Sequence, residues 1–358
     1  MNSICFITKG DLRNNTNSKR ALGMAMPLHK LGWDISIIML DTPENHKQID
    51  LSCSTAIRVY YYTHAYQINN IVRSIKPYII YINSLLFSDI FYIRYKCKKI
   101  VEYCELYSEY EDYSFIKRLK HKFSNYFAIF YSSGLVSASL YIKNFFDEKT
   151  KLPILYLPYA YNPTVTYIKH KEDIKSNIIK YEDKINFIYL GTIVRYYGIF
   201  TILKAVLILS RKYNNFRVIV CGQGKDYSNI LKYIEENNLK DFIVAPGFVE
   251  ENDIPDYFSI ADAFLSPIFD TTRDKARCPS KLYMYLPYEK PIITCKIGEP
   301  YQTLGAEGLY YEPDNSEQLA LKMEEVLLGE KTTININADN HNWMARAIEF
   351  EKWVKTIK

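Results

Sequence analysis

The chain has 358 residues, of which 48% are hydrophobic and 24% charged, so it is long enough for about two globular domains, and a disulfide-stapled miniprotein or a disordered chain is excluded. The 45 basic and 40 acidic residues leave a net charge of +5, too small an excess for a nucleic-acid-binding protein with a dense basic stripe. The 33 tyrosines are spread along the chain, so biased composition explains them better than a platform for stacking bases does.

The seven cysteines are scattered and include no Cys-x-x-Cys pair, which predicts a reducing compartment and no structural zinc. The apolar first seven residues run into Thr8, Lys9 and Gly10 without the basic start or cleavage site of a signal peptide. No stretch approaches the roughly 18 uninterrupted apolar residues of a spanning helix. We therefore expect a cytoplasmic protein.

In the first half of the chain, short apolar runs alternate with longer amphipathic stretches, the pattern of a parallel α/β sheet. Strands are predicted at residues 3–8, 34–39, 58–62, 78–82, 99–103, 128–132 and 154–157. A loop at residues 10–16 precedes a helix over 18–31, which we expect to end at Gly32, because glycine favours the left-handed conformation after a helix. Helices fill the other gaps.

Residues 168–184 are rich in charge and lack apolar periodicity, as a linker or a solvated helix would be. A second α/β series follows, with strands at 185–190, 216–221, 242–246, 263–267 and 291–294 and helices at 199–212, 227–238, 254–259, 280–286 and 342–355. The last helix has an apolar face made of Trp343, Ala347, Phe350 and Trp353. We predict two Rossmann-like lobes facing each other across a cleft, at residues 1–165 and 166–335, with residues 336–358 as a helix packed on a lobe.

Ligands of open parallel sheets bind beyond the carboxyl ends of the strands, and two glycine-bearing loops are expected there in the second half. After the strand at 185–190, Gly191 allows the backbone to approach a ligand closely, and the guanidinium of Arg195 can donate several hydrogen bonds to a phosphate. The alternative is a tight turn with a solvent-facing arginine. After the strand at 216–221, Gly222 and Gly224 form a Gly-x-Gly, but Tyr227 interrupts the dinucleotide pattern, so an NAD site is only weakly indicated.

A third segment combines a loop at 266–278 with the start of a helix. Pro279 and a capping Ser280 predict exposed amides at the helix start, an anion-binding arrangement. Positive charge is concentrated around it, on Arg273, Lys275, Arg277 and Lys281. Like charges at this density need an acidic partner, and a diphosphate would supply it.

The fourth segment is the carboxyl end of the predicted strand at 99–103. Strand alternation puts Glu102 and Glu105 on opposite sides of the sheet. Either residue is a candidate functional carboxylate. A solvated acidic loop, continued by Glu109, Glu111 and Asp112, is the alternative.

Taken in order, segments of the second half resemble the donor lobe of GT-B glycosyltransferases of group 1, of the retaining family 4 type. The resemblance covers roughly residues 185–328. Its segments are Tyr189-Leu190-Gly191-Thr192 with Gly198, residues 218–224, Pro246-Gly247-Phe248-Val249, residues 254–263, Pro279-Ser280-Lys281-Leu282, Lys290-Pro291-Ile292-Ile293, and Gly308-Leu309 before Pro313. The first half looks like the family's more variable acceptor lobe.

This resemblance implies retaining transfer of a sugar from a nucleotide-diphosphate donor to the hydroxyl of a glycan or lipid-linked acceptor, in cell-surface polysaccharide or glycolipid synthesis, without a cofactor or metal. The donor-binding residues it implies are Gly191, Thr192, Arg195, Gly222, Phe248, Val249, Arg277, Ser280, Lys281 and Met284. It places Glu105 and Asp270 as catalytic carboxylates, and Gly10 and Asp11 on the acceptor side.

The sequence departs from the family at three points. Thr192 and Tyr197 stand where an Arg and a Lys are common, which leaves Arg195 as the substitute cation. Of the family's paired glutamates, the ribose-binding one is replaced by Met284 and the sugar-contacting one by Ala276, so that Asp270 or Asp274 would have to stand in for the latter. A catalytically impaired relative that binds a glycan or a partner subunit is therefore the alternative function, and a two-lobed epimerase is a weaker one.

Residues 114–131 contain four basic residues and no acidic ones, interleaved with aromatic and aliphatic side chains. A basic helix with an aromatic face can lie on an anionic bilayer, where lipid-linked acceptors are found. A helix that buries its apolar face in the core and exposes its basic side to solvent is the alternative.

Overall fold

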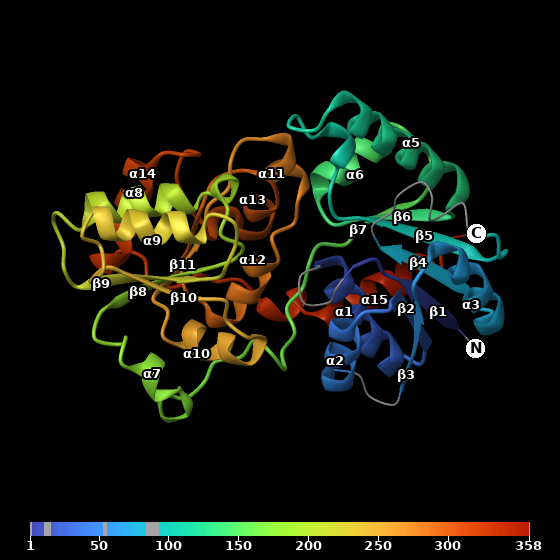
Figure 1. The fold of residues 1–358 in the computed structure, drawn as a ribbon, viewed down its shortest axis with the longest axis horizontal. Helices are drawn as coiled ribbons and strands as arrows, with labels where there is room; N and C mark the ends of the chain where they lie inside the picture. The colour runs from blue at the N-terminus through green and yellow to red at the C-terminus, as the bar shows by residue number, and fades with distance from the viewer. Residues whose placement is uncertain (1, 11–15, 53–55, 84–92, 358) are drawn as a thin grey trace. The chain divides into compact units, whose positions relative to one another are not determined.

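The computed structural model describes residues 2–10, 16–52, 56–83 and 93–357 (Figure 1). Its contacts divide the chain into two units. Unit 1 comprises Met1–Ala160, Lys275–Cys278 and His341–Lys358, and unit 2 comprises Tyr161–Asp274 and Pro279–Asn340. The chain therefore passes between the units several times.

The strands of unit 1 are β1 (Ser3–Ile7), β2 (Asp34–Leu40), β3 (Ile57–Tyr62), β4 (Ile79–Asn83), β5 (Lys98–Tyr103), β6 (Gly134–Ser137) and β7 (Ile154–Tyr156). Among the described residues they form one parallel sheet in the order β3-β2-β1-β4-β5-β6-β7. Its helices are α1 (Thr16–Lys30), α2 (Pro43–Ser52), α3 (Ile68–Ile75), α5 (Phe115–Tyr131), α6 (Leu140–Asp147) and α15 (Trp343–Val354).

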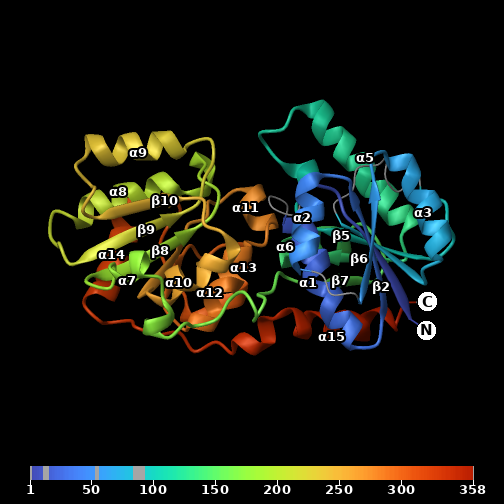
Figure 2. The same ribbon diagram turned by 60° about the horizontal axis from the view of Figure 1, so that its bottom comes forward.

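Helices cover both faces of this sheet, because its central strands are apolar on both sides. Cys5 and Ile7 of β1 face the α3 side with Val72, and α5 and α6 extend this layer over β5 and β6. On the other face, Tyr81 lies between Phe6 and Phe350 of α15, with ring centroids 5.1 and 5.4 Å away. The two layers are visible above and below the sheet in Figure 2.

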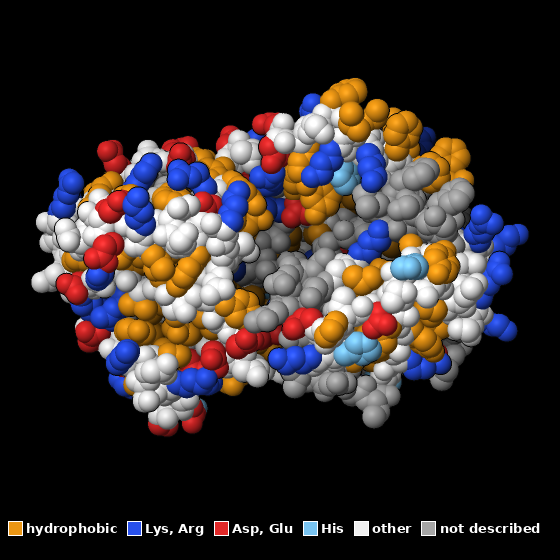
Figure 3. Space-filling model, in the orientation of Figure 1, with side chains coloured by type: hydrophobic (Ala, Val, Ile, Leu, Met, Phe, Trp, Pro, Cys, Tyr) orange, Lys and Arg blue, Asp and Glu red, His pale blue; other side chains and the backbone are white. Residues whose placement is uncertain are grey.

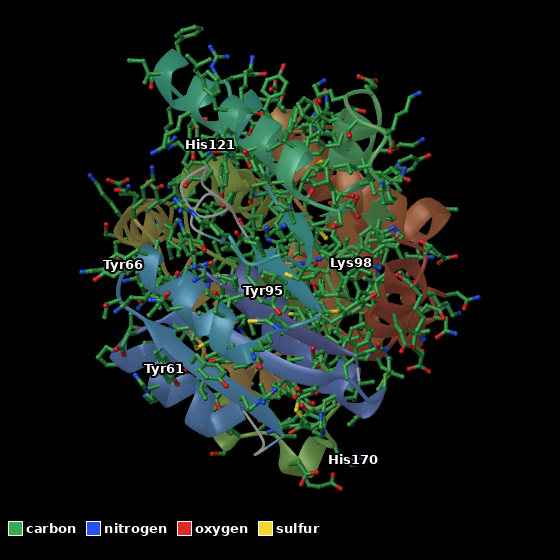
Figure 4. The ribbon with its side chains drawn as sticks, turned by 90° about the vertical axis from the view of Figure 1, so that its right-hand side faces the viewer. Tyr61, Tyr66, Tyr95, Lys98, His121 and His170 are labelled. Atoms are coloured by element: carbon green, nitrogen blue, oxygen red, sulfur yellow. The ribbon has the colours of Figure 1, made fainter. Side chains whose placement is uncertain are left out.

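The C-terminal helix packs on α1 within unit 1. Gly23 of α1 makes room for it, since a Cβ atom there would lie 2.3 Å from the indole of Trp343. At the other end, Lys98, labelled in Figure 4, donates from Nζ to the carbonyl of Ile357 (2.7 Å). Of the residues predicted to form the apolar face of this helix, Trp343, Ala347 and Phe350 are buried.

The strands of unit 2 are β8 (Ile185–Leu190), β9 (Phe216–Cys221), β10 (Ile243–Gly247), β11 (Ala263–Ser266), β12 (Ile292–Thr294) and β13 (Leu309–Tyr310). They pair in parallel in the order β10-β9-β8-β11-β12-β13. The helices are α7 (Ser176–Ile179), α8 (Ile199–Leu209), α9 (Tyr227–Glu236), α10 (Ile254–Ser259), α12 (Ser280–Tyr285), α13 (Gly298–Leu304) and α14 (Ser316–Leu327), and α11 (Thr272–Ala276) crosses from unit 2 into unit 1.

This second sheet is also buried on both faces. Alternate residues of β8 and β9 share one core with α8, α9 and α14. On the other face, Phe264 of β11 stacks on Tyr285 of α12 (4.1 Å) and meets Phe258 of α10 edge to face (5.1 Å). The two Rossmann-like sheets and the C-terminal helix confirm the predicted fold class. In the described part of the chain no helix is both long and apolar enough to span a membrane.

Two predicted elements are wrong. Residues 128–132 are mostly the last turn of α5, not a strand, and β6 begins only at Gly134. The helix is set at its start, where the Ser114 hydroxyl accepts from the amide of Lys117 (3.4 Å), and its period of 3.6 continues through the aromatic run. The predicted loop at 266–278 contains α11, because the Thr271 hydroxyl accepts from the amide of Asp274 (3.2 Å).

Candidate functional site

Both sheets reverse their strand order beside the first strand, between β1 and β4 and between β8 and β11, and such switch points are where open α/β sheets bind ligands. In unit 2 the loops that follow β8 and β11 meet there. Gly198, at φ +78°, has no room for a side chain, because a Cβ atom would lie 2.5 Å from Pro267.

Backbone hydrogen bonds tie the carboxyl ends of β8, β9 and β10 together. The amide of Gly191 donates to the carbonyl of Cys221 (3.0 Å), and the amide of Gly222 donates to that of Gly247 (2.7 Å). A Cβ atom at residue 222 would lie 1.9 Å from the carbonyl oxygen of Gly191. Glycine is thus required at 222 to pack the two loops together.

Lys281 of α12 reaches the first of these loops. Its Nζ lies 3.9 Å from the ring centroid of the fully buried Tyr189 and is among the atoms nearest to Gly191. A cation over an aromatic face is attracted by the ring quadrupole. The buried tyrosine therefore holds the charge of Lys281 beside the Gly191 backbone.

Arg195 lies further along the same loop, with its guanidinium carbon 4.4 Å from the ring centroid of Phe200. Its backbone amide donates to Oδ2 of Asp226 (2.8 Å). This hydrogen bond, with a second one from Asn229, lowers the pKa of the Asp226 carboxyl. The carboxylate fixes the loop backbone and leaves the Arg195 side chain exposed on its aromatic support.

Tyr196 brings two more cations to this loop. Lys225, just after the Gly-x-Gly turn, and Arg273 of α11 lie 5.2 and 5.0 Å from its ring centroid. The sequence prediction missed Lys225 and Tyr196, although the position of Lys225 directly after Gly224 was an available signal. We call Arg195, Lys225, Arg273 and Lys281 the cation rim of residues 191–198.

The other two predicted cations do not join this rim within unit 2. Lys275 and Arg277 belong to the segment that folds with unit 1. Ala276 between them is fully buried in the core of unit 1 with Val101 and Leu135. Position 276, which the family resemblance associates with a sugar-contacting glutamate, is therefore a core position in this chain.

Unit 1 has a different arrangement at the carboxyl ends of its strands. Glu102 near the end of β5 is only 2% exposed, and its carboxylate accepts from Nε of Arg20 (2.6 Å) and from the Asn83 amide. Arg20 also donates from Nη2 to the carbonyl of Leu157 (2.7 Å). Burial opposes the charge of Arg20, but Glu102 offsets this, and the pKa of Arg20 is raised well above its usual value. Glu102 thus belongs to a buried ion pair, and the alternative of a solvated acidic loop is wrong for it.

Glu105 lies beyond the end of β5, so strand alternation does not fix its direction. It is half-buried, and the hydroxyl of Tyr110 donates to its Oε2. Gly10 has φ +103°, and its carbonyl accepts from Nδ2 of Asn45 (3.3 Å). Asp11 lies outside the described residues.

The comparisons with known proteins agree with this geometry. Residues 170–343 match the family model "Glycosyl transferases group 1". Unit 2 is a group 1 glycosyltransferase domain. No curated protein sequence matched the chain.

Solved structures show the same fold over the whole chain. Alr3699/HepE from Anabaena, in complex with UDP and glucose, has a TM-score of 0.78 at 14% identity, with 99% of this chain and 100% of that one covered. Sucrose-phosphate synthase from Thermosynechococcus elongatus has a TM-score of 0.75 at 15% identity, covering 99% and 98%. The apo lipopolysaccharide outer core galactosyltransferase WaaB has a TM-score of 0.67 at 11% identity, covering 99% of both chains. The resemblance to GT-B glycosyltransferases is thereby confirmed.

Within this glycosyltransferase domain, the start of α12 differs from the prediction. Pro279 is the residue before the helix, and the Ser280 side chain makes no capping hydrogen bond. With its fixed φ, Pro279 sets the chain direction into the helix without a hydroxyl cap. Ser280 and Met284 are half-buried.

The remaining predicted donor residues differ in exposure. Thr192 and Phe248 are exposed and Val249 is half-buried. Phe248 and Val249 follow β10 directly, at the same sheet edge as the cation rim. This places them where a ligand of the switch point can reach them.

The two aspartates proposed to replace the missing glutamate are not equivalent. Asp274 is 1% exposed, and its Oδ2 accepts from the amide of Phe269 (2.7 Å), so it holds the turn before α11. Asp270 is exposed in the loop that follows β11. Only Asp270 of the two is accessible to a substrate.

A hollow of about 590 Å³ lies at the opposite, amino ends of β8 to β10. Its lining includes Arg217, whose Nη1 donates to Asp183 (2.9 Å) and to the carbonyl of Tyr181 (3.0 Å). Arg217 is therefore paired with a carboxylate of the same hollow.

Proposed function

We propose that this protein transfers a glycosyl group from a nucleoside-diphosphate sugar to an acceptor hydroxyl, with retention of configuration at the anomeric carbon. The observation that carries the proposal is the cation rim, above all Lys281 held against Gly191 at the switch point of unit 2. A diphosphate gains negative charge as it leaves, and fixed cations stabilise that charge more strongly in the transition state than in the bound donor.

The reaction breaks the bond between the anomeric carbon and the diphosphate oxygen and forms one to the acceptor oxygen. The proton of the acceptor hydroxyl passes to the departing diphosphate oxygen, and the nucleoside diphosphate leaves. Asp270, exposed after β11, is our candidate for contact with the donor sugar, and Glu105 is our candidate carboxylate in unit 1.

The donor class is supported by relatives in complex with uridine nucleotides. Alr3699/HepE has been solved with UDP-glucose, and the pneumococcal O-GlcNAc transferase GtfA with UDP and GlcNAc. These relatives are 14% and 11% identical to this chain. For this protein we propose Gly191, Thr192, Arg195, Gly222, Phe248, Val249, Ser280, Lys281 and Met284 as the donor-binding set in unit 2.

The acceptor we propose is the hydroxyl of a cell-surface glycan or a lipid-linked saccharide, with Gly10 and Asp11 on the acceptor side. We also propose that turnover needs no divalent metal, since the cation rim supplies positive charge next to the leaving group. Full activity after removal of metal with a chelator is the expected result.

A second function is favoured by two positions. Met284 and the buried Ala276 replace the carboxylates expected from the family resemblance, and their loss would suit a protein that binds a glycan or a partner subunit without turnover.

A donor screen followed by a hydrolysis assay separates the two functions. UDP-, GDP-, dTDP- and CMP-sugars are tested for thermal stabilisation, which for a ligand at 100 times its dissociation constant amounts to about 2.7 kcal/mol. The stabilising donor is then tested for slow hydrolysis. Binding with hydrolysis supports the transferase, binding without turnover supports the second function, and no stabilisation by any nucleotide sugar contradicts both the donor site and the transferase.

A further inference from the structure

Helix α5 of unit 1 has a clear inner side. Ser124 and Ala128 are buried, and Asn125 donates from Nδ2 to the hydroxyl of Ser108 (3.0 Å) in the short helix before α5. The ring of His121 lies 5.1 Å from that of Tyr107. These contacts fix which side of α5 faces the rest of unit 1.

The opposite side carries an apolar stripe that unit 1 does not cover. Leu119, Phe123, Tyr126 and Phe130 follow one another at intervals of four, three and four residues, so they share one helix face. Their exposed fractions are 41%, 55%, 68% and 85%. At the start of α5 this stripe, which we call the α5 stripe, continues with Phe115 and Ile116, 72% and 79% exposed.

This arrangement excludes the alternative in which α5 buries its apolar face in the core. Figure 3 shows the hydrophobic side chains gathered on the surface over α5. In Figure 4, where His121 is labelled, side chains on the outer side of α5 project away from the sheet. Exposed apolar patches of this kind mark interaction sites in folded proteins.

Basic residues border the α5 stripe on both sides. At about 100° of rotation per residue, Lys122 and Arg118 lie about 70° and 110° to one side of the stripe, and Lys120 lies about 90° to the other. Lys117 instead lies over the ring of Tyr113 (3.3 Å). The helix contains no acidic residue.

We propose that α5 is a membrane-docking helix that lies in the plane of an anionic lipid bilayer, with the α5 stripe inserted and the basic borders against lipid phosphates. Aromatic and aliphatic side chains at the centre of a face, with lysine and arginine at its edges, are the arrangement that this interface favours. A second copy of this chain fits less well, since a symmetric contact would place basic borders against basic borders.

This inference goes beyond the proposed function and does not depend on the donor. It gives the protein a route to acceptors that are anchored in a membrane. Because its test is a binding measurement without nucleotide sugar, failure of the donor site and failure of membrane docking are distinguishable.

The test is flotation of the full-length protein with vesicles of phosphatidylcholine containing about 30% phosphatidylglycerol, compared with pure phosphatidylcholine. We expect wild type to float with the anionic vesicles at low salt, to remain unbound with the neutral ones, and to be released at high salt. Phe123→Ser with Phe130→Ser should weaken binding at least tenfold, since each exposed ring loses its apolar burial in the bilayer.

The matched control for this pair is Leu231→Ser with Leu321→Ser, two exposed apolar residues of unit 2 (44% and 54%), which should leave vesicle binding unchanged. Lys120→Gln with Lys122→Gln should weaken binding by about fivefold per charge, or about 25-fold in total. Lys232→Gln with Lys240→Gln, on exposed lysines of unit 2, is its control.

Melting temperatures close to that of wild type in both α5 variants show that the losses are not caused by unfolding. Absence of wild-type binding to anionic vesicles at low salt overturns the proposal, and so does full binding by the Phe123/Phe130 variant. Sedimentation equilibrium tests the remaining alternative. If wild type is a dimer and the Phe123/Phe130 variant is a monomer, the α5 stripe binds a second copy of the chain, and the membrane assignment is overturned.

Discussion

The carboxyl ends of the two sheets differ in how they hold charge. In unit 1, Arg20 and Glu102 are almost fully buried and bonded to each other. In unit 2, the cation rim surrounds a glycine-bearing loop, and its charges lie over the aromatic rings of Tyr189, Tyr196 and Phe200.

The two arrangements of charge suit different roles, one in stability and the other in ligand binding. A buried ion pair is compensated within the protein, so a bound anion adds little to it, whereas removing one partner leaves an isolated buried charge. A cation on an aromatic face remains electrostatically available to an anion. Unit 1 therefore uses its charges at this edge to hold the fold, whereas we propose that the cation rim of unit 2 binds a ligand.

The largest expected effect comes from breaking the buried pair. Arg20→Ala should lower the free energy of unfolding by about 3–5 kcal/mol, because it leaves Glu102 charged and buried. Urea denaturation measures this. Lys143→Ala, which removes a surface partner of Asp147 in α6, is the control and should cost at most about 1 kcal/mol. A loss for Arg20→Ala as small as that of the control would show that the pair does not hold unit 1.

Gly222→Ala tests the packing of the loops that follow β8 and β9, which we propose bind the donor. The new Cβ atom would lie 1.9 Å from the Gly191 carbonyl, so the loops must separate, and we expect at least tenfold weaker nucleotide binding in calorimetry with a stability loss of about 1–3 kcal/mol. Gly329→Ala is matched, since residue 329 also has positive φ (+73°) but no atom within 4 Å of its added Cβ. Equal nucleotide affinity in both variants would argue that residues 191 and 222 do not shape the site.

Met284→Glu tests the ribose position in unit 2. If position 284 faces the ribose, the new carboxylate should accept from its hydroxyls and tighten donor binding by about tenfold, a typical value for a charged hydrogen bond. Leu321→Glu, on an exposed position of α14, controls for the added charge. An unchanged dissociation constant would remove position 284 from the donor site.

The smallest effect concerns acid stability of unit 1. Burial, together with the nearby Arg346, lowers the pKa of His341 to about 4, against about 6.5 in the unfolded chain. The fold favours the neutral ring, so the stability it contributes is present above pH 6.5 and is lost as the pH falls toward 4.

After allowance for solvent screening, we expect His341→Asn to reduce the loss of unfolding free energy between pH 7 and pH 4.5 by up to about 1 kcal/mol. His170→Asn, at the exposed position labelled in Figure 4, should leave the loss unchanged. Identical pH dependence in wild type and His341→Asn would contradict the assignment.

The sequence predicted local structure well where apolar runs end at glycine or proline. The strands at 185–190 and 216–221 have the predicted bounds and end directly before Gly191 and Gly222. The helix at 254–259, with Pro255 in its first turn, also has the predicted bounds. The prediction failed at 128–132 because an aromatic run fits the last turn of an amphipathic helix as well as a short strand. Ser114 caps the helix that contains this run, and Ala128 is buried on the inner side of that helix.

The site was predictable in part. The order of the motifs identified Gly191, Arg195 and Lys281, but it did not reveal which residues contact the charged side chains. Arg20 and Glu102 are 82 residues apart, and the tyrosine that gathers Lys225 and Arg273 is recognised only when three loops are placed together. The sequence also grouped Lys275 and Arg277 with Lys281, although the fold assigns them to different units.

The most direct test of the account is steady-state turnover of the nucleotide sugar by Lys281→Ala, compared with Lys184→Ala. Lys184 also lies over an aromatic ring, that of Phe242 (5.5 Å), but at the amino end of the sheet. If Lys281 stabilises the leaving diphosphate, kcat should fall about ten- to a hundredfold in Lys281→Ala, while the dissociation constant of the donor changes less. Lys184→Ala should match wild type. Unchanged turnover and unchanged nucleoside-diphosphate affinity in Lys281→Ala would contradict the central claim that the cation rim is the donor site.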